Sequence, residues 1–255
     1  VKLTEKPNAE FQSIYAGFNE MAAEISTLMR NVSEEHNRKI IATIQMLQTE
    51  INPHMLYNSL ESIYSIAKIN QQEEIANLVM ALSRFFRIAL SGGKHLVPFR
   101  EAFELAKQYV TVQNIRLNYK ILFTYDIPEN IYDLNVPKFL LQPVIENCII
   151  HGFQNKRGEW HINLSVNEEG DWVVLTVRDN GIGIHDSTLA RLNKRVENFN
   201  FEDSAMGKGY ALRNLNYQIK LKFGEESGIR LNSVYGEYTE VVIRLNLAGR
   251  KTTRG

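Results

Sequence analysis

Pro53 and His54 stand in the middle of a long helical pattern that spans Leu47 to Leu60. A proline inside a helix removes one backbone amide and bends the helix, so the imidazole of His54 would be presented at a bend. An imidazole can act as a nucleophile near neutral pH, and Asn58, one turn further on, would share its face of the helix. His54 and Asn58 are therefore one candidate reaction centre. The alternative for this stretch alone is a proline kink beside a structural histidine.

A second candidate is the pair Glu146 and Asn147, which interrupts an apolar helical pattern over Pro137 to Ile150. Burying polar groups in a helix is costly unless they are used. The amide oxygen of Asn147 suits Mg²⁺, and Glu146 can accept a proton. Taken singly, polar residues in a helix are more often structural, so this pair needs support from the rest of the chain.

Two glycine-containing motifs follow. Asp179-Asn180-Gly181-Ile182-Gly183 stands at the end of a predicted strand, where glycines let a ligand approach the backbone and a carboxylate can accept a hydrogen bond from an exocyclic amine. Gly207-Lys208-Gly209 leads into a helical pattern, and its exposed amides, the helix dipole and the lysine would favour phosphate. The alternatives are a tight turn for the first motif and an ordinary loop for the second.

The elements that position these residues begin with a long apolar seam. Its members recur in steps of three and four at Phe11, Ile14, Phe18, Met21, Ile25, Leu28 and Val32. This spacing predicts a coiled coil and hence a dimer. The next seam residue, Ile40, comes one residue later than the heptad predicts, so the supercoil should change there. A plain dimerisation helix and a signalling helix are both consistent with this pattern.

Two further helices and an α/β unit are predicted after the seam. Amphipathic stretches over 56–67 and 75–89, separated by a polar corner, predict an antiparallel helical hairpin, and two hairpins from a dimer would form a four-helix bundle. Beyond Gly93 the pattern predicts a layered α/β unit with a largely antiparallel mixed sheet. Its strands are expected over 121–125, 161–166, 172–177, 229–234 and 238–247, and its helices over 97–118, 137–150 and 210–223.

Composition narrows the class of protein. The chain has 255 residues, enough for about two domains, and it carries 29 Lys plus Arg against 29 Asp plus Glu, so no basic excess favours nucleic acid. The single cysteine, Cys148, excludes an internal disulfide and suits a reducing compartment such as the cytoplasm. No run of 18 apolar residues occurs, and the chain begins at Val1, as expected for a piece of a longer protein.

The order and spacing of the motifs carry more weight than any one of them. Glu146-Asn147, Asp179-x-Gly181-x-Gly183 and Gly207-x-Gly209 before a helix together resemble the Bergerat ATP-binding fold that gyrase, heat-shock-90, histidine kinase and MutL ATPases share. Placed after INPHMLYNSL, with LQPVIENCIIHG between, the set resembles the LytS/YesM-type sensor histidine kinases over roughly residues 8 to 247. The helix segment FNEMA, residues 18–22, resembles the second helix of a HAMP linker.

This resemblance implies a fold of α plus α/β class: an N-terminal coiled coil and helical-hairpin dimer, then a Bergerat-type α/β sandwich. We expect the HAMP-like helix and signalling coiled coil over 1–39, the dimerisation and phosphotransfer hairpin over 40–95, and the ATP-binding domain over 96–255. It also implies a homodimer, a response-regulator receiver domain as partner, and an upstream transmembrane sensor. The chain would then be the cytoplasmic portion of a bacterial cell-membrane protein.

The same resemblance implies roles for individual residues. His54 is expected to accept phosphate from ATP, and Asn147 to bind Mg²⁺ with Glu146 beside it. Asp179 is expected to read adenine. The helical spacing, and not the resemblance, makes Asn58 a candidate to orient the imidazole or to serve a phosphatase step; the alternative is an amide that only solvates the bend. Backbone sites around ATP are expected at Gly181, Gly183, Gly207 and Gly209, and the charge of Lys208 in the last loop makes it a further candidate for the phosphates.

Several positions depart from the family pattern. Met55 stands where the family usually has phenylalanine, Ile150 where a basic residue often occurs, and Ala211 where a further glycine is usual. Because Met55 cannot accept a proton, the sequence assigns no catalytic base. Two other classes of function stay open: a degenerate nucleotide-binding scaffold that never phosphorylates His54, and a hydrolytic Bergerat ATPase in which Glu146 activates water.

Overall fold

The computed structural model describes residues 53–91, 95–117, 121–153, 158–197 and 210–248. The heptad seam, the HAMP-like helix and the turn before Pro53, where the bend was expected, lie outside these residues. So do the predicted phosphate-loop residues Gly207, Lys208 and Gly209. None of the helices that the structure does describe is long and apolar enough to cross a membrane.

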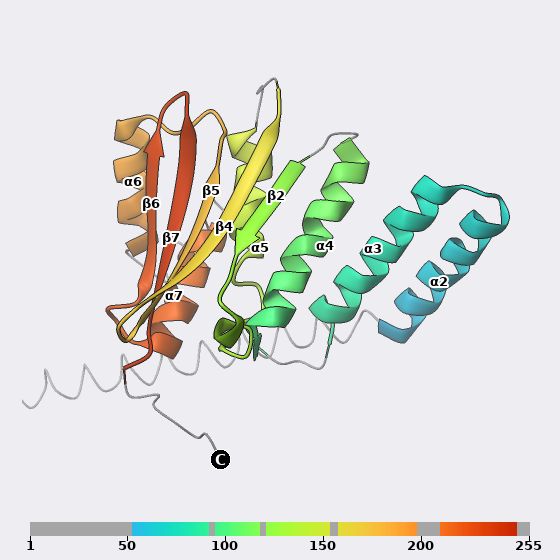
Figure 1. Cartoon of the computed structure of the whole chain (residues 1–255), viewed down its shortest axis with the longest axis horizontal. Helices are drawn as coiled ribbons and strands as arrows, with labels where there is room; N and C mark the ends of the chain where they lie inside the picture. The colour runs from blue at the N-terminus through green and yellow to red at the C-terminus, as the bar shows by residue number, and fades with distance from the viewer. Residues whose placement is uncertain (1–52, 92–94, 118–120, 154–157, 198–209, 249–255) are drawn as a thin grey trace, which may run out of the picture. The chain divides into compact units, whose positions relative to one another are not determined.

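The described part begins with a helical hairpin, as the sequence predicts. Helices α2 (Pro53–Ile69) and α3 (Glu73–Ala89) lie side by side in Figure 1. The Tyr57 hydroxyl, near the start of α2, donates to the carbonyl oxygen of Phe86, near the end of α3, at 3.2 Å, so the helices are antiparallel. Gln71 adopts φ +54° in the polar corner between them.

A small two-stranded sheet connects the hairpin to the rest of the chain. Strand β1 (Leu96–Pro98) pairs antiparallel with β3 (Asn135–Pro137). The predictions of a helix opening at Val97 and of another opening at Pro137 are therefore wrong, because both residues are used in this strand pair. Each strand has three residues and one proline, which is too short for an alternating pattern to show.

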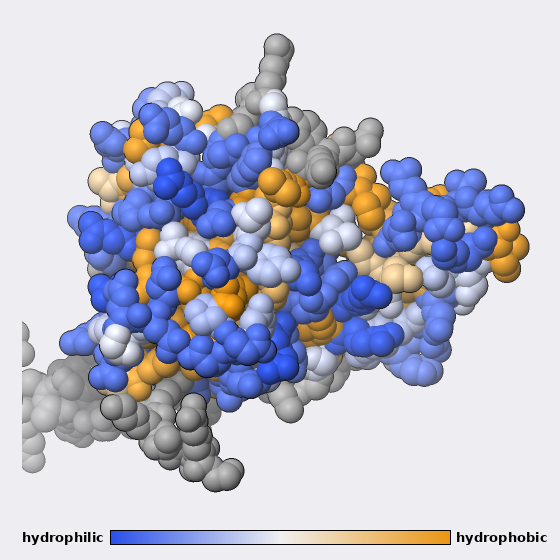
Figure 2. Space-filling model, viewed as in Figure 1, coloured by the Kyte–Doolittle hydropathy of each residue, from blue (hydrophilic) through white to orange (hydrophobic). Residues whose placement is uncertain are grey.

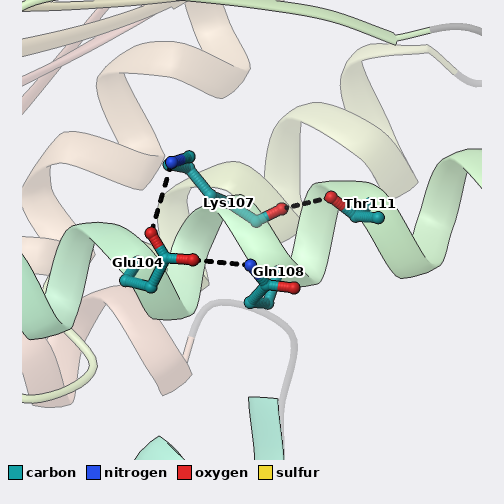
Figure 3. A network of polar contacts seen from close by, with 4 residues as sticks. All are labelled: Glu104, Lys107, Gln108 and Thr111. Carbon is teal, nitrogen blue, oxygen red and sulfur yellow. Dashed lines mark hydrogen bonds and ion pairs between the residues drawn. The ribbon is translucent and has the colours of Figure 1, made fainter. Parts of the chain in front are cut away.

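Helix α4 (Phe99–Leu117) follows β1 and packs on α3. Its core side carries Phe99, Leu105 and Ala106, none of them exposed to solvent. Another side is polar: Glu104 accepts hydrogen bonds from Lys107 at 3.2 Å and Gln108 at 2.6 Å (Figure 3). This helix therefore presents one apolar side to the protein interior.

The main sheet has five strands in the order β2-β4-β5-β7-β6. The pair β2-β4 is parallel and the other pairs are antiparallel, so the predicted mixed, largely antiparallel sheet is correct. The strands are β2 (Ile121–Asp126), β4 (Trp160–Glu169), β5 (Trp172–Asp179), β6 (Gly228–Val234) and β7 (Tyr238–Asn246), with a short 3₁₀ turn, η2 (Glu129–Ile131), after β2.

Helices cover one face of this sheet (Figure 1). Alternate residues of the strands, such as Ile162, Leu164 and Leu175, point into the core against them and are 0% exposed. The other face carries polar residues and cation–π pairs, and the view in Figure 2 shows hydrophilic and smaller hydrophobic areas mixed. The covering helices are α5 (Gln142–Asn147), α6 (Asp186–Glu197) and α7 (Tyr210–Phe223).

The predicted helix over 137–150 is corrected in two ways. It begins only at Gln142, with Pro143 in its first turn, where a missing amide does no harm. After Asn147 the chain widens into a π-helical segment, η3 (Cys148–Gly152), in which the Phe153 amide donates to the Cys148 carbonyl oxygen at 3.0 Å. Such π segments are frequent at functional sites.

Asparagine side chains occupy the backbone edges of the sheet. On β6, Asn193 of α6 both donates to and accepts from Leu231, and Asn216 of α7 accepts from the Ile229 amide at 2.7 Å. Asn114 of α4 bonds Ile121 of β2 in the same way. These contacts satisfy edge groups and fix the helices on the sheet.

Candidate functional site

His54 lies in the first turn of α2, on an exposed part of the helix. The amide nitrogen of Asn58 is 3.3 Å from His54 Nδ1, so the predicted pairing along one helical face is observed. Which atom donates depends on the imidazole tautomer and on the orientation of the amide. If the amide oxygen faced the ring, Nδ1–H would donate to it, and Nε2 would keep the lone pair that a nucleophile needs.

Asp179 is the last residue of β5 and is only 2% exposed. Its Oδ1 accepts a hydrogen bond from the Gly181 amide at 2.8 Å. A Cβ atom on Gly181 would lie 2.5 Å from Asp179 Oδ1 and closer still to the Gly152 carbonyl oxygen. A Cβ atom on Gly152 would lie 2.9 Å from Asp179 Oδ1. Glycines are therefore required at both positions to leave room for the buried carboxylate.

The segment Asp179–Gly183 is held on three sides. The Asn180 side chain accepts from the His161 amide of β4 at 2.9 Å, and the Ile182 amide donates to Gly152 at 2.8 Å. The Gly236 amide, in the β6-β7 turn, donates to the Ile182 carbonyl oxygen at 2.7 Å. The loop that carries the candidate adenine-reading carboxylate is thus fixed by β4, by the end of η3 and by the β6-β7 turn.

Gly183 has a different requirement from that of Gly181. Its φ of +66° lies in the left-handed region, which favours glycine, and a Cβ atom there would overlap the carbonyl oxygen of Val234. The following amide, of Ile184, donates to Ser233 Oγ at 2.8 Å. Gly183 therefore lets the loop lie directly against the β6-β7 turn.

Glu146 and Asn147 are the last two residues of α5, and both are half-buried. Burial, and to a smaller extent the Glu146 carboxylate, raise the pKa of Tyr109 on α4. The Asn147 side chain makes no hydrogen bond to another described residue. No group of three or more His, Cys, Asp or Glu side chains in the described ranges could hold a metal ion by itself.

Cys148 connects this pair to Asp179. The cysteine follows Asn147 directly and is 3% exposed, and its pKa is raised by burial and then by the neighbouring Asp179 carboxylate. The structure therefore brings Glu146, Asn147 and Asp179 to one region, as the order of the motifs predicts. His54 and Asn58 lie apart from them in the chain's fold, on the helical hairpin.

Two residues of this region were not found from the sequence. Thr239 of β7 is the register partner of Asp179, and its hydroxyl lies 3.3 Å from Ser233 Oγ. Gly152 contacts Asp179 from η3. The pairing of β5 with β7 has no signal in a single sequence, whereas Gly152 ends the same run that contains Glu146 and could have been inferred from its glycine.

Family models match most of the chain. A model of histidine kinases matches residues 42–121, and a model of the ATPases similar to histidine kinase, DNA gyrase B and HSP90 matches residues 134–249. The first range contains the candidate acceptor His54, and the second contains Asn147 and Asp179.

Curated relatives are similar over nearly the whole chain. Sensor histidine kinase YesM of Bacillus subtilis is 31% identical over 96% of this chain and 40% of its own length. Sensor protein LytS of Streptococcus agalactiae is 30% identical over 81% of this chain and 35% of its own. Sensor histidine kinase YpdA of Escherichia coli is 31% identical over 85% of this chain and 38% of its own length. The chain therefore spans about two fifths of the length of these relatives.

Solved structures of kinases are more distant in sequence. The histidine kinase domain of the blue-light activated kinase EL346 from Erythrobacter litoralis is 16% identical, with a TM-score of 0.43, over 78% of this chain and 95% of that one. The catalytic domain of histidine kinase ThkA is 13% identical, with a TM-score of 0.41, over 59% of this chain and 93% of that one.

Proposed function

The chain belongs to the LytS/YesM-type sensor histidine kinases of two-component systems, and from this membership we propose that it autophosphorylates His54 with ATP. The phosphoryl group would then pass to an aspartate of a response-regulator receiver domain. One observation carries the proposal: an exposed imidazole on a helical hairpin occurs in the same chain as a buried, loop-held carboxylate beside a Glu-Asn pair.

Asp179 suits recognition of adenine. A carboxylate that is 2% exposed can discriminate strongly, because an amine donor replaces water that the site largely excludes. One oxygen already accepts from the Gly181 amide, which fixes the orientation of the carboxyl group for an incoming exocyclic amine. The glycines at 152, 181 and 183 let the backbone pack closely around this carboxylate and against Val234.

Asn147 and Glu146 suit the phosphate end of the nucleotide. The Asn147 amide oxygen, half-buried and without a hydrogen bond to another described residue, fits as a ligand of Mg²⁺, which would neutralise charge on the phosphates. Glu146 precedes it directly in α5, and its carboxylate raises the pKa of Tyr109. Because an isolated amide oxygen binds Mg²⁺ weakly, Asn147 would need the phosphates of ATP as further ligands.

His54 would supply the nucleophile. An imidazole nitrogen forms a bond to the γ-phosphorus while the bond from that phosphorus to the bridging oxygen of ADP breaks, and the ring proton leaves to solvent or to a base not yet assigned. Asn58, turned so that its oxygen accepts from Nδ1–H, would hold the ring in the tautomer that has its lone pair on Nε2. Positioning of the two reactants would provide most of the rate.

The hairpin also supports the proposed homodimer. Met55, Ile63, Ile66, Ile69 and Ile75 of α2 and α3 are between 46% and 80% exposed in the single chain. Apolar side chains in such number on two adjacent helices favour a second hairpin as their cover. We propose that the chain acts on the cytoplasmic side of a bacterial membrane, joined to a sensor in the remaining length of the protein.

Incubation of the chain with γ-labelled ATP and Mg²⁺ tests the proposal. We expect label on the protein that acid removes and alkali does not, since a phosphohistidine is acid-labile. Release of labelled phosphate without label on the protein would instead identify a hydrolytic ATPase. Nucleotide binding with neither product would identify a degenerate scaffold.

A further inference from the structure

Lys138 is a buried lysine that lies outside the regions described so far. It follows β3 directly and is 5% exposed. Its Nζ donates to the carbonyl oxygen of Ser91 at 2.8 Å and lies 3.4 Å from the carbonyl oxygen of Ala89, the last residue of α3. Ser91 Oγ is 3.5 Å away. Lys138 therefore binds the carboxyl end of the helical hairpin.

The charge of Lys138 matches this position. The carbonyl groups at the end of a helix carry partial negative charge and attract a cation. Burial lowers the pKa of Lys138, and the Glu101 carboxylate opposes that effect. Since no ion pair among the described residues includes Lys138, the end of α3 supplies its closest acceptors. A buried ammonium that lost these acceptors would be unfavourable, so it is held there or becomes exposed to water.

Other contacts secure the same junction. The backbone amide of Lys138 donates to the carbonyl oxygen of His95 at 3.0 Å, and β3 pairs with β1 just before it. In the packing of α3 on α4, the ring centroid of Phe85 lies 6.4 Å from that of Tyr109. The hairpin is thus attached to the α/β unit, residues 95–248, through α3 and through Lys138.

This attachment determines whether ATP bound to the α/β unit can reach His54. Helix α2 packs on α3, and α3 packs on α4, so α3 lies between the acceptor helix and the α/β unit (Figure 1). A helix with its side chains is about 10 Å across. His54 therefore stays on the far helix for as long as α3 is held in this place.

We propose that Lys138 is a positioning residue that holds α3 against the α/β unit in a state that withholds His54 from ATP. The inference rests on the proposed kinase function and adds its regulation. When the contact opens, Nζ enters water and is solvated, and the α/β unit is released as a rigid body to approach the acceptor. A signal that moves the hairpin would act by shifting the balance between these two states.

The test compares three variants of the full chain. Lys138→Met removes the donors with little change in length, and Lys138→Arg keeps a cation that can donate to the same carbonyl groups. Lys220→Met is the matched control, because Lys220 lies at the end of α7 and its Nζ is 3.8 Å from Glu225. Each variant is measured for hydrogen exchange at residues 85–91, for ATP affinity and for the initial rate of His54 labelling.

We expect Lys138→Met to exchange about tenfold faster at the end of α3 and to take label several-fold faster, because a charge-assisted contact is lost. ATP affinity should stay within about twofold, since Lys138 is not among the proposed nucleotide ligands. Lys138→Arg and Lys220→Met should resemble the wild type in all three measurements. Unchanged exchange in Lys138→Met would show that Lys138 does not hold α3, and faster exchange with equal or slower labelling would refute the withheld state.

A second experiment does not depend on the fold of the Lys138 variants. Cysteines at Phe85→Cys and Tyr109→Cys, joined by a short bis-maleimide, should fix α3 on α4 and prevent labelling while ATP still binds. Labelling at the wild-type rate after cross-linking would overturn the proposal. If the wild-type chain itself takes no label, the proposed kinase function fails, whereas the exchange comparison still decides whether Lys138 holds α3.

Discussion

His54 and Asp179 stand in opposite environments. The imidazole lies on an exposed helical turn beside the Asn58 amide, whereas the carboxylate is 2% exposed, accepts from the Gly181 amide and begins a loop that several elements fix. The difference fits the roles proposed for the two residues. A phospho-acceptor has to meet ATP and then a receiver domain in turn, so it must be accessible, whereas an adenine reader gains selectivity from exclusion of water.

Because the loop that follows Asp179 is closely packed, small changes in it should have large effects on ATP binding. Gly183→Ala and Gly170→Ala place a methyl group at nearly the same backbone angle, φ +66° and +64°, but only Gly183 faces another chain segment, at Val234. Both variants should lose about 1 kcal/mol from backbone strain. Gly183→Ala should in addition lose most ATP binding, because the β6-β7 turn must shift.

Calorimetry with ATP and thermal unfolding of both variants measure these two effects. Equal ATP affinities in Gly183→Ala and Gly170→Ala would show that the packing of the loop against the β6-β7 turn does not shape the nucleotide site.

Asp179→Asn tests the proposed hydrogen bond between the Asp179 carboxylate and adenine. An amide can accept from adenine but carries no charge, so ATP affinity should fall about tenfold or more. The matched control is Asp171→Asn, an exposed position in the β4-β5 turn, where affinity should not change. If isothermal titration finds equal affinity in both variants, adenine is read elsewhere.

The buried region should also respond to pH. The pKa of Cys148 is raised by burial and by Asp179, so the folded state resists formation of the thiolate. Its stabilising effect is complete below roughly pH 8.5, the usual pKa of a thiol, and is lost as the pH rises through the higher pKa of the folded state. The free energy of unfolding should fall more steeply with alkaline pH in the wild type than in Cys148→Ala. Parallel profiles from urea unfolding would contradict this assignment.

Substitutions on the exposed turn that carries His54 should change activity less than those around Asp179. The 3.3 Å contact between Asn58 and His54 is open to solvent, so Asn58→Ala should keep autophosphorylation within about threefold. Dephosphorylation of a cognate receiver domain should slow if Asn58 orients the attacking water. Loss of autophosphorylation with full phosphatase activity would instead make Asn58 a holder of the imidazole.

Regular patterns in the sequence predicted the long elements well. The hairpin of β4 and β5 and the bounds of α7 follow from alternation and from helical spacing, because burial repeats along each element. The short strands β1 and β3 were missed, and the helix before Glu146 was predicted to begin five residues before Gln142, because pairing of three residues leaves no period to detect.

The site was predictable in its motifs and not in its contacts. Asp179 and the glycines after it were found from residue type and order, whereas Thr239 depends on the register of β5 with β7. The hold of Lys138 on Ser91 joins residues 47 positions apart, and no local pattern marks it. The three domain ranges and the roles of the individual site residues stay predictions.

Substitution of His54 separates phosphoryl transfer from nucleotide binding. We expect His54→Gln to take no acid-labile label from ATP while its affinity for ATP stays within about twofold of wild type, since the acceptor is not part of the nucleotide pocket. Mass spectrometry of the wild-type chain should find the phosphoryl group on the peptide that contains His54. Acid-labile label that persists in His54→Gln would show that another residue accepts the phosphoryl group.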